Sequence, residues 1–261
     1  MFFFQYCIGI SWFIISLAMS SINDIVAQGL STRLSPLETS FYRFFFGTLT
    51  LLPVIWYKGY RVIHTSRMSM HLVRGIFLAA AMFLWITGIN RTEIVTATIV
   101  SFTIPIFVLL FAAIFLKEQQ SLKFSLLSIV VLIAVVVILH PHHVSVNSGT
   151  GLLFIASLLF AGLDVINKQY INKEKLLSML FYSSVITTVI AAVPMLIHFQ
   201  TWEVPTAADF ISFIILGIGS NAILFCLLKA FHLVKLSSIG LFRYLELIAA
   251  LIYTTCSTVT I

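Results

Sequence analysis

The sequence repeats itself: SSINDIVAQGLSTRLSPLETSFY at residues 20–42 returns as FAGLDVINKQYINKEKLLSMLFY at residues 160–182. Both stretches contain an aspartate followed by two β-branched residues, and both end in Phe-Tyr. Thr48 and Thr188 continue the match, and every matched pair is separated by 140 positions. Internal repeats in such an apolar chain are typical of membrane transporters built from two related halves.

The composition excludes an ordinary soluble domain. Hydrophobic residues make up 60% of the chain and charged residues 9%, where a soluble domain would carry about 25% charged residues. The mean hydropathy is +1.09. Because a membrane helix needs about 20 mostly apolar residues, the sequence predicts an all-α, polytopic inverted-repeat helix bundle. Its nine predicted spans are Phe4–Gln28, Pro36–Tyr57, Met70–Ile89, Ile94–Leu116, Leu122–His140, Thr150–Ile171, Leu177–His198, Asp209–Ala230 and Ser237–Ser257.

The distribution of basic residues predicts the orientation. If the N-terminus is cytoplasmic, eleven lysines and arginines lie near cytoplasmic helix ends, and only Arg33 and Arg91 lie near the opposite ends. This asymmetry follows the positive-inside rule. The net charge of +6 is therefore an orientation signal, and we expect the lipid bilayer, not nucleic acid, as its partner. The eleven are Lys58, Arg61, Arg67, Arg74, Lys117, Lys123, Lys168, Lys173, Lys175, Lys229 and Lys235.

The repeat divides the chain into a five-helix half, residues 1–140, and a second half, residues 141–261, with four predicted helices. An odd number of helices makes the second half enter the membrane upside down. Such inverted repeats give secondary carriers two exchangeable states, with the substrate site near the midplane between the halves. A structural fold that happens to be duplicated is the alternative.

The chain resembles the EamA-type ten-helix carriers of the drug/metabolite transporter superfamily. The resemblance covers nearly the whole chain. The stretches that carry it are Ser16–Tyr42, Gly88–Glu118 with Pro105 and Leu116-Lys117-Glu118, Phe160–Tyr182 and Phe242-Arg243-Tyr244-Leu245-Glu246. Within the superfamily the chain is most similar to S-adenosylmethionine uptake carriers of intracellular bacteria. The resemblance implies import of S-adenosylmethionine across a bacterial inner membrane, with exchange for a spent product as one mode.

One departure from the family pattern concerns the end of the chain. Carriers of this family have ten helices and a cytoplasmic C-terminus, whereas the aligned second repeat stops at Ile261, where the acidic end of its fourth helix is expected. We therefore expect the last helix to be missing and the C-terminus to lie outside. Two alternatives to uptake stay open: an exporter of amino acids, drugs or other metabolites on the same framework, and an inactive, shortened carrier.

Ionisable residues inside the predicted spans are the first candidates for the substrate site, because each is costly to insert into a bilayer. Arg43 lies about seven residues into the second span, roughly 10 Å deep, and its guanidinium suits a substrate carboxylate. Asp24, next to Asn23, can hold a cation or a proton. An ion pair of Arg43 with Asp24 or Glu38 is the structural alternative.

The second half supplies the other candidates. Asp164 is the repeat counterpart of Asp24 and lies in the middle of the sixth span, where Lys168 four residues later could neutralise it. Arg243 and Glu246 are three residues apart in the ninth span and can pair locally. Tyr42 and Tyr244 offer aromatic faces for a cation or a ring.

Other chemistries are not expected. His140-Pro141-His142-His143 lies in a short loop without a nearby cysteine or carboxylate to complete a metal site. Gly217-Ile218-Gly219-Ser220 lies in an apolar span without an evident partner histidine for a nucleophilic serine. There is no Walker or dinucleotide motif. We therefore expect neither an enzyme nor a bound cofactor.

Overall fold

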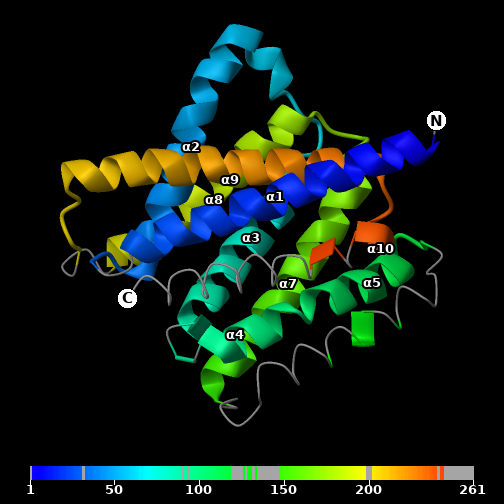
Figure 1. The fold of residues 1–261 in the computed structure, drawn as a ribbon. Coiled ribbons are helices and arrows are strands. Elements are labelled where there is room, and N and C mark those ends of the chain that lie inside the picture. The colour runs from blue at the N-terminus through cyan, green and yellow to red at the C-terminus, as the bar shows by residue number, and fades with distance from the viewer. Residues whose placement is uncertain are drawn as a thin grey trace.

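The computed structural model describes residues 2–30, 33–89, 91–92, 94–118, 126, 128–130, 133, 147–197, 202–239 and 242–243, and every structural statement refers to these residues. This part of the chain is helical (Figure 1). Its helices are α1 (Phe2–Leu30), α2 (Pro36–Lys58), η1 (Tyr60–Val62), α3 (Met68–Ile89), α4 (Ile94–Ser101), α5 (Ile104–Phe115), α7 (Ser148–Tyr170), α8 (Leu176–Ile197), α9 (Ala207–Leu233) and α10 (Leu236–Ile239).

Five of these helices, α1, α3, α7, α8 and α9, are long and apolar enough to cross a bilayer. Helix α2 is also 23 residues long but carries Glu38, Arg43 and Lys58. The fold class is therefore confirmed as an all-helical, polytopic membrane bundle. Most residues of the predicted spans Leu122–His140 and Ser237–Ser257 lie outside the described part of the chain, so the count of nine stays a prediction.

Local capping explains where the helices begin. Before α2, the Ser35 hydroxyl accepts a hydrogen bond from the Glu38 N–H at 3.3 Å, and the Glu38 carboxylate accepts one from the Ser35 N–H at 2.7 Å. This reciprocal capping box satisfies two N–H groups that the helix leaves unpaired. Pro36 follows as the first helical residue, where its missing N–H is harmless.

The predicted fourth span is two helices instead of one bent helix. Helix α4 ends at Ser101 and α5 begins at Ile104. Pro105 has no N–H to donate to the carbonyl one turn earlier, and its ring clashes with that turn. The chain forms a turn at Thr103 instead, whose N–H donates to the Val100 carbonyl at 3.0 Å. The missing N–H of Pro105 in the middle of the predicted span Ile94–Leu116 predicts a bend in that helix, and the structure has a break between two helices instead.

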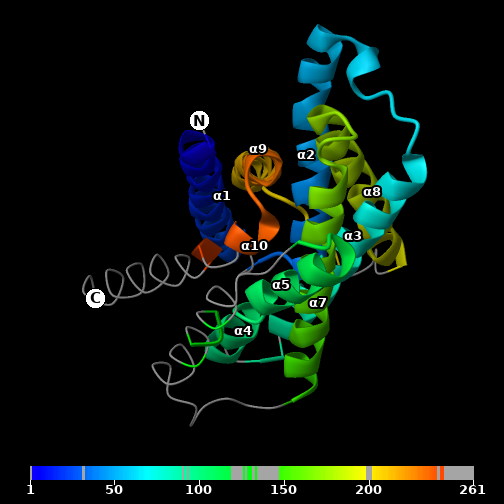
Figure 2. The same cartoon turned by 90° about the vertical axis from the view of Figure 1, so that its right-hand side faces the viewer.

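The helices of the two halves pack on each other reciprocally. Helix α1 packs mainly on α9, and α3 packs mainly on α7 (Figures 1 and 2). In the predicted repeat, α1 and α7 are the first helices of their halves, and α3 and α9 are the third. Each first helix thus contacts the third helix of the other half, as a two-fold relation between inverted repeats requires.

The reciprocity extends to single side chains. The ring of Tyr42 on α2 stacks on Phe213 of α9, with centroids 4.3 Å apart. The ring of Tyr182 on α8 lies against His71 of α3, with centroids 4.7 Å apart. Tyr182 follows Tyr42 by 140 residues, and Phe213 follows His71 by 142. The same contact is therefore made twice, at opposite ends of the bundle.

The largest buried apolar cluster joins α1, α5, α7, α9 and α10. Phe13, Val108 and Phe231 are 2%, 3% and 1% exposed, so this region is closely packed. The cluster surrounds the middle of α7. It therefore fixes the surroundings of Asp164, which projects from that helix.

Candidate functional site

An ion pair joins Asp164 and Arg243, which are 79 residues apart in the sequence. The guanidinium of Arg243 donates from Nη2 to Oδ2 of Asp164 at 3.1 Å, and the two side chains are 19% and 9% exposed. Both residues were predicted site residues, but their pairing with each other was not predicted. Because the pair is removed from water, each charge strongly requires a partner of opposite sign.

Lys168, the expected local partner of Asp164, points elsewhere. Its ammonium group donates to the backbone carbonyls of Phe231 and Val234, at the end of α9. A lysine at this place satisfies two carbonyls that a helix end leaves unpaired, and it lies at the negative end of the helix dipole. Lys168 was predicted to lie at a cytoplasmic helix end. The structure makes it a link between α7 and α9.

A small cavity opens beside the ion pair. It has room for about one water molecule, so this arrangement is closed to a metabolite. Its walls combine the two charged side chains with apolar and aromatic groups from α1, α5, α9 and α10. The lining residues are Phe13, Pro105, Val108, Asp164, Phe231, Leu236, Ile239 and Arg243.

A second polar cluster brings together Asn23 and Arg43, which were both predicted site residues. They meet at Ser220 of α9, whose hydroxyl accepts from Nε of Arg43 at 2.5 Å and from the Asn23 amide at 3.2 Å. The Asn23 amide also lies 3.4 Å from the carbonyl of Leu216. Ser220 itself donates to that carbonyl at 2.7 Å. The cluster therefore holds α1, α2 and α9 together.

The close approach of α1 and α9 at this cluster depends on Gly219. A Cβ atom at this position would lie 2.3 Å from Oδ1 of Asn23, well inside contact distance. The Gly217–Ser220 stretch thus has a structural role that the sequence did not suggest. Along α1, Asn23 lies ten residues beyond Phe13 of the cavity, roughly 15 Å of helix. The two polar clusters are therefore separate.

The remaining predicted residues divide into two groups. Tyr42 is described, and it is half-buried against Phe213. The backbone of Asp24 lies in α1, but its side chain lies outside the described part of the structure, as do Tyr244 and Glu246. Glu38, one suggested partner of Arg43, instead accepts hydrogen bonds from the backbone N–H groups of Ser35 and Glu203.

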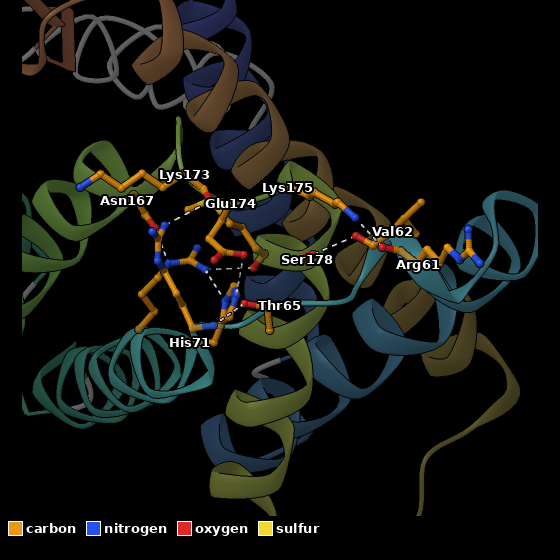
Figure 3. A network of polar contacts seen from close by, with 12 residues as sticks. Arg61, Val62, Thr65, His71, Asn167, Lys173, Glu174, Lys175 and Ser178 are labelled. Atoms are coloured by element: carbon orange, nitrogen blue, oxygen red, sulfur yellow. Dashed lines mark hydrogen bonds and ion pairs between the residues drawn. The ribbon is translucent and has the colours of Figure 1, made fainter.

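A third polar cluster was missed by the sequence analysis (Figure 3). Arg74 was predicted to lie at a cytoplasmic helix end, but it is 1% exposed. Its Nε donates to Asn167 of α7 at 2.7 Å and its Nη1 to the Met179 carbonyl of α8 at 3.3 Å. His71 and Glu174 complete the cluster. The burial of Arg74 was not predicted, because the predicted span began at Met70 and placed Arg74 closer to the helix start than Arg43, whereas α3 begins at Met68.

Comparisons with known proteins agree with this architecture. The model of the EamA-like transporter family matches residues 7–140. The S-adenosylmethionine uptake transporter of Rickettsia bellii is 39% identical over 95% of this chain and 84% of its own length. That of Rickettsia prowazekii is 40% identical over 95% and 83%. A riboflavin transporter of Brucella anthropi is 28% identical over 69% of this chain and 64% of its own length.

A solved structure shares the fold. A protein known from a crystal structure aligns with a TM-score of 0.72, covering 93% of this chain and 84% of its own, at 15% identity. At that identity the likeness concerns the arrangement of helices alone.

Proposed function

Because the chain belongs to the EamA-like transporter family and is a multi-pass membrane transporter, we propose that it imports S-adenosylmethionine across a bacterial inner membrane. The relatives with this named substrate are 39% and 40% identical over nearly the whole chain. The structural observation that carries the proposal is the Asp164–Arg243 ion pair, with its 3.1 Å contact beside a cavity between the halves.

The chemistry of the pair suits the proposed substrate. S-Adenosylmethionine carries a sulfonium cation, an amino-acid head with both charges, and an adenine ring. When the pair opens, Arg243 can bind the carboxylate through two parallel hydrogen bonds. Asp164 can then bind the ammonium or sulfonium group. Each charged residue thus exchanges its protein partner for a group of opposite charge on the substrate, so neither charge is left buried without a partner.

Aromatic side chains supply the remaining contacts. Phe13 and Phe231 line the cavity, and their faces can hold a sulfonium cation or stack on adenine. We include Asn23, Asp24, Tyr42 and Arg43 as a second group of substrate contacts, reached when the bundle opens. Tyr244 and Glu246 belong to the same proposal on the strength of their positions beside Arg243.

Transport then proceeds by alternating access between residues 1–140 and residues 141–261. The reciprocal contacts of Tyr42 with Phe213 and of Tyr182 with His71 support this division, because they relate the two ends of the bundle by the repeat. The N-terminus is cytoplasmic in this proposal. Accordingly, the start of α3 is at the cytoplasmic end, and the start of α9 is at the outer end.

Binding of radiolabelled S-adenosylmethionine to the purified full chain tests the proposal. Binding is compared with that of three partial analogues. S-Adenosylhomocysteine lacks the sulfonium charge, methionine has only the amino-acid head, and adenosine has only the nucleoside with its adenine ring. Asp164→Asn should weaken binding of S-adenosylmethionine about tenfold, equivalent to roughly 1.4 kcal/mol, and should affect S-adenosylhomocysteine less. Asp209→Asn, at the beginning of α9, is the matched control and should bind normally. Equal binding by the Asp164→Asn variant and the parent would reject the assignment.

A further inference from the structure

The buried cluster of His71, Arg74 and Glu174 contains none of the proposed substrate contacts, and its bond to Asn167 lies three residues beyond Asp164 on α7 (Figure 3). It occupies the end of the bundle where α3 begins, α7 ends and α8 begins, here named the inner end. His71 is 0% exposed and Arg74 is 1% exposed. The Glu174 side chain is 6% exposed. Three ionisable groups buried together in a membrane protein favour a functional role.

The hydrogen-bond geometry defines the protonation state of His71. Nη1 of Arg74 lies 3.4 Å from Nδ1 of His71. A guanidinium group only donates, so Nδ1 must accept and cannot carry a proton. This contact fits a neutral imidazole with its proton on Nε2, which faces Oε2 of Glu174 at 3.6 Å.

A second proton has no place in this arrangement. Protonation of Nδ1 would replace an acceptor by a donor and set an imidazolium against a guanidinium in a dry site. Arg74 cannot turn away freely, because Asn167 and the Met179 carbonyl hold it. Among the described residues, the ring of Tyr182 also lies against the imidazole, and Glu174 is the carboxylate that faces it. Protonation must therefore loosen the contact of α3 with α7 and α8.

The cluster is already incompletely bonded. Among the described residues, Nη2 of Arg74 and Nε2 of His71 are buried without a hydrogen-bond partner. Buried donors are normally paired, so such groups favour rearrangement when the local charge changes.

The opposite end of the bundle lacks this property. Its equivalent contact joins Tyr42 to Phe213, and phenylalanine cannot take a proton. Among the described residues of these two equivalent contacts, only the one at the inner end contains an imidazole, which can take a proton near neutral pH. A proton can consequently distinguish the two ends of an otherwise reciprocal structure.

We propose that His71 is a proton-binding site that controls the opening of the inner end. With neutral His71 the inner end is closed, as in this structure. When Nδ1 takes a proton from the aqueous phase, repulsion within α3 displaces the Arg74 guanidinium from Asn167 of α7 and from the Met179 carbonyl of α8. Loss of these two bonds separates α3 from α7 and α8, and the inner end opens. This inference rests on the alternating access of the proposed function.

The test uses the accessibility of a single cysteine and requires no substrate. Ser178 is 0% exposed at the inner end and lies one helical turn before Tyr182 on α8. Ser178→Cys is introduced after Cys7, Cys226 and Cys256 are replaced by alanine, and the full chain is reconstituted in liposomes. Ser66→Cys, on the exposed loop before α3, corrects for the pH dependence of the maleimide reaction itself. The ratio of the two labelling rates is measured.

We expect this ratio to rise about tenfold as the pH is lowered from about 8 to about 5, the interval in which the surroundings of a histidine decide where it takes its proton. His71→Asn keeps an acceptor for Arg74 and cannot become charged, so its ratio should stay low. His64→Asn removes an exposed histidine of the same loop and should respond like the parent. A flat ratio in the parent, or an equal rise in His71→Asn, would overturn the proposal.

Glu174→Gln keeps the test decisive if His71→Asn does not fold. This variant removes the anion that favours the imidazolium, so the midpoint of the labelling response should move to lower pH. An unchanged midpoint would contradict the proposal. Because labelling is measured without S-adenosylmethionine, a surviving pH response together with absent uptake would reject the substrate and leave the proton site intact.

Discussion

Gly75 and Gly217 occupy equivalent places in the two halves. A Cβ atom on Gly75 of α3 would lie 2.3 Å from the Ile186 side chain of α8. One on Gly217 of α9 would lie 2.7 Å from the backbone of Phe46 on α2. Ile186 follows Phe46 by 140 residues, and Gly217 follows Gly75 by 142. The third helix of each half therefore touches the second helix of the other through a glycine.

This relation predicts the effect of adding a methyl group. Gly217→Ala should destabilise the protein by about 1–3 kcal/mol, the usual cost of overpacking, because the clash is with backbone that cannot move alone. Gly75→Ala should cost a similar amount, since the clash includes Cβ of Ile186 at 2.6 Å, an atom that cannot move without its backbone. Gly151→Ala on α7 has no atom within 4 Å and is the control. Thermal unfolding in detergent measures all three, and equal stabilities for Gly217→Ala and Gly151→Ala would contradict the packing.

The Asp164–Arg243 pair predicts non-additive mutations. Asp164→Asn or Arg243→Gln alone leaves one charge unpaired in a mostly buried place, whereas the double variant leaves none. The losses of stability should therefore be coupled by about 0.5–3 kcal/mol, while uptake is lost in all three variants. Arg33 and Asp209 form a comparable pair with Arg33 48% exposed, and its coupling should be much smaller. Additive losses at Asp164 and Arg243 would show that the pair does not form.

Substitution of Arg43 is expected to weaken recognition of the substrate without lowering the amount of protein in the membrane. Arg43→Ala removes a guanidinium that can bind a carboxylate bidentately, so the apparent affinity in uptake should fall roughly tenfold or more. Arg43→Lys keeps the positive charge and should retain part of the apparent affinity. Ser220→Ala removes only the hydroxyl that positions the guanidinium and should have the smallest effect. Uptake kinetics at matched membrane levels measure this order, and unchanged uptake by Arg43→Ala removes this residue from the site.

Replacement of Pro105 by alanine is expected to raise the stability of the protein and to slow transport. Pro105→Ala restores a backbone N–H at the break between α4 and α5, so a continuous helix becomes favourable. The protein should unfold at higher temperature. Uptake should slow, because Pro105 lines the cavity beside Asp164 and a straight helix moves that wall. A variant that is less stable and transports normally would show that the break is imposed by the surrounding helices.

The helices and their reciprocal arrangement could be predicted because the information is local or repeated. Long apolar runs locate the spans, and Ser35 with Glu38 marks the start of α2 through neighbouring residues. The break before Pro105 was predicted only as a kink. Whether a proline bends or interrupts a helix depends on tertiary contacts, and no local pattern reports them.

The partners of the charged residues could not be predicted for the same reason. From the sequence alone, a charged residue in a helix can be paired only with residues three or four positions away. Lys168 was therefore the predicted ion-pair partner of Asp164. The actual partner, Arg243, comes from a distant segment. Arg74 was placed near a cytoplasmic helix end because it lies close to the start of its predicted span, and that position does not report burial. Packing of α7 and α8 against α3 buries it.

Uptake of radiolabelled S-adenosylmethionine by cells that make this 261-residue chain shows whether the protein imports this substrate. Cells without an uptake system of their own serve as the background, and Asp164→Asn at an equal membrane level serves as the control. The account predicts saturable uptake by the parent that unlabelled S-adenosylmethionine suppresses and that Asp164→Asn lacks. Background uptake by the parent, with the protein present in the membrane, would contradict it.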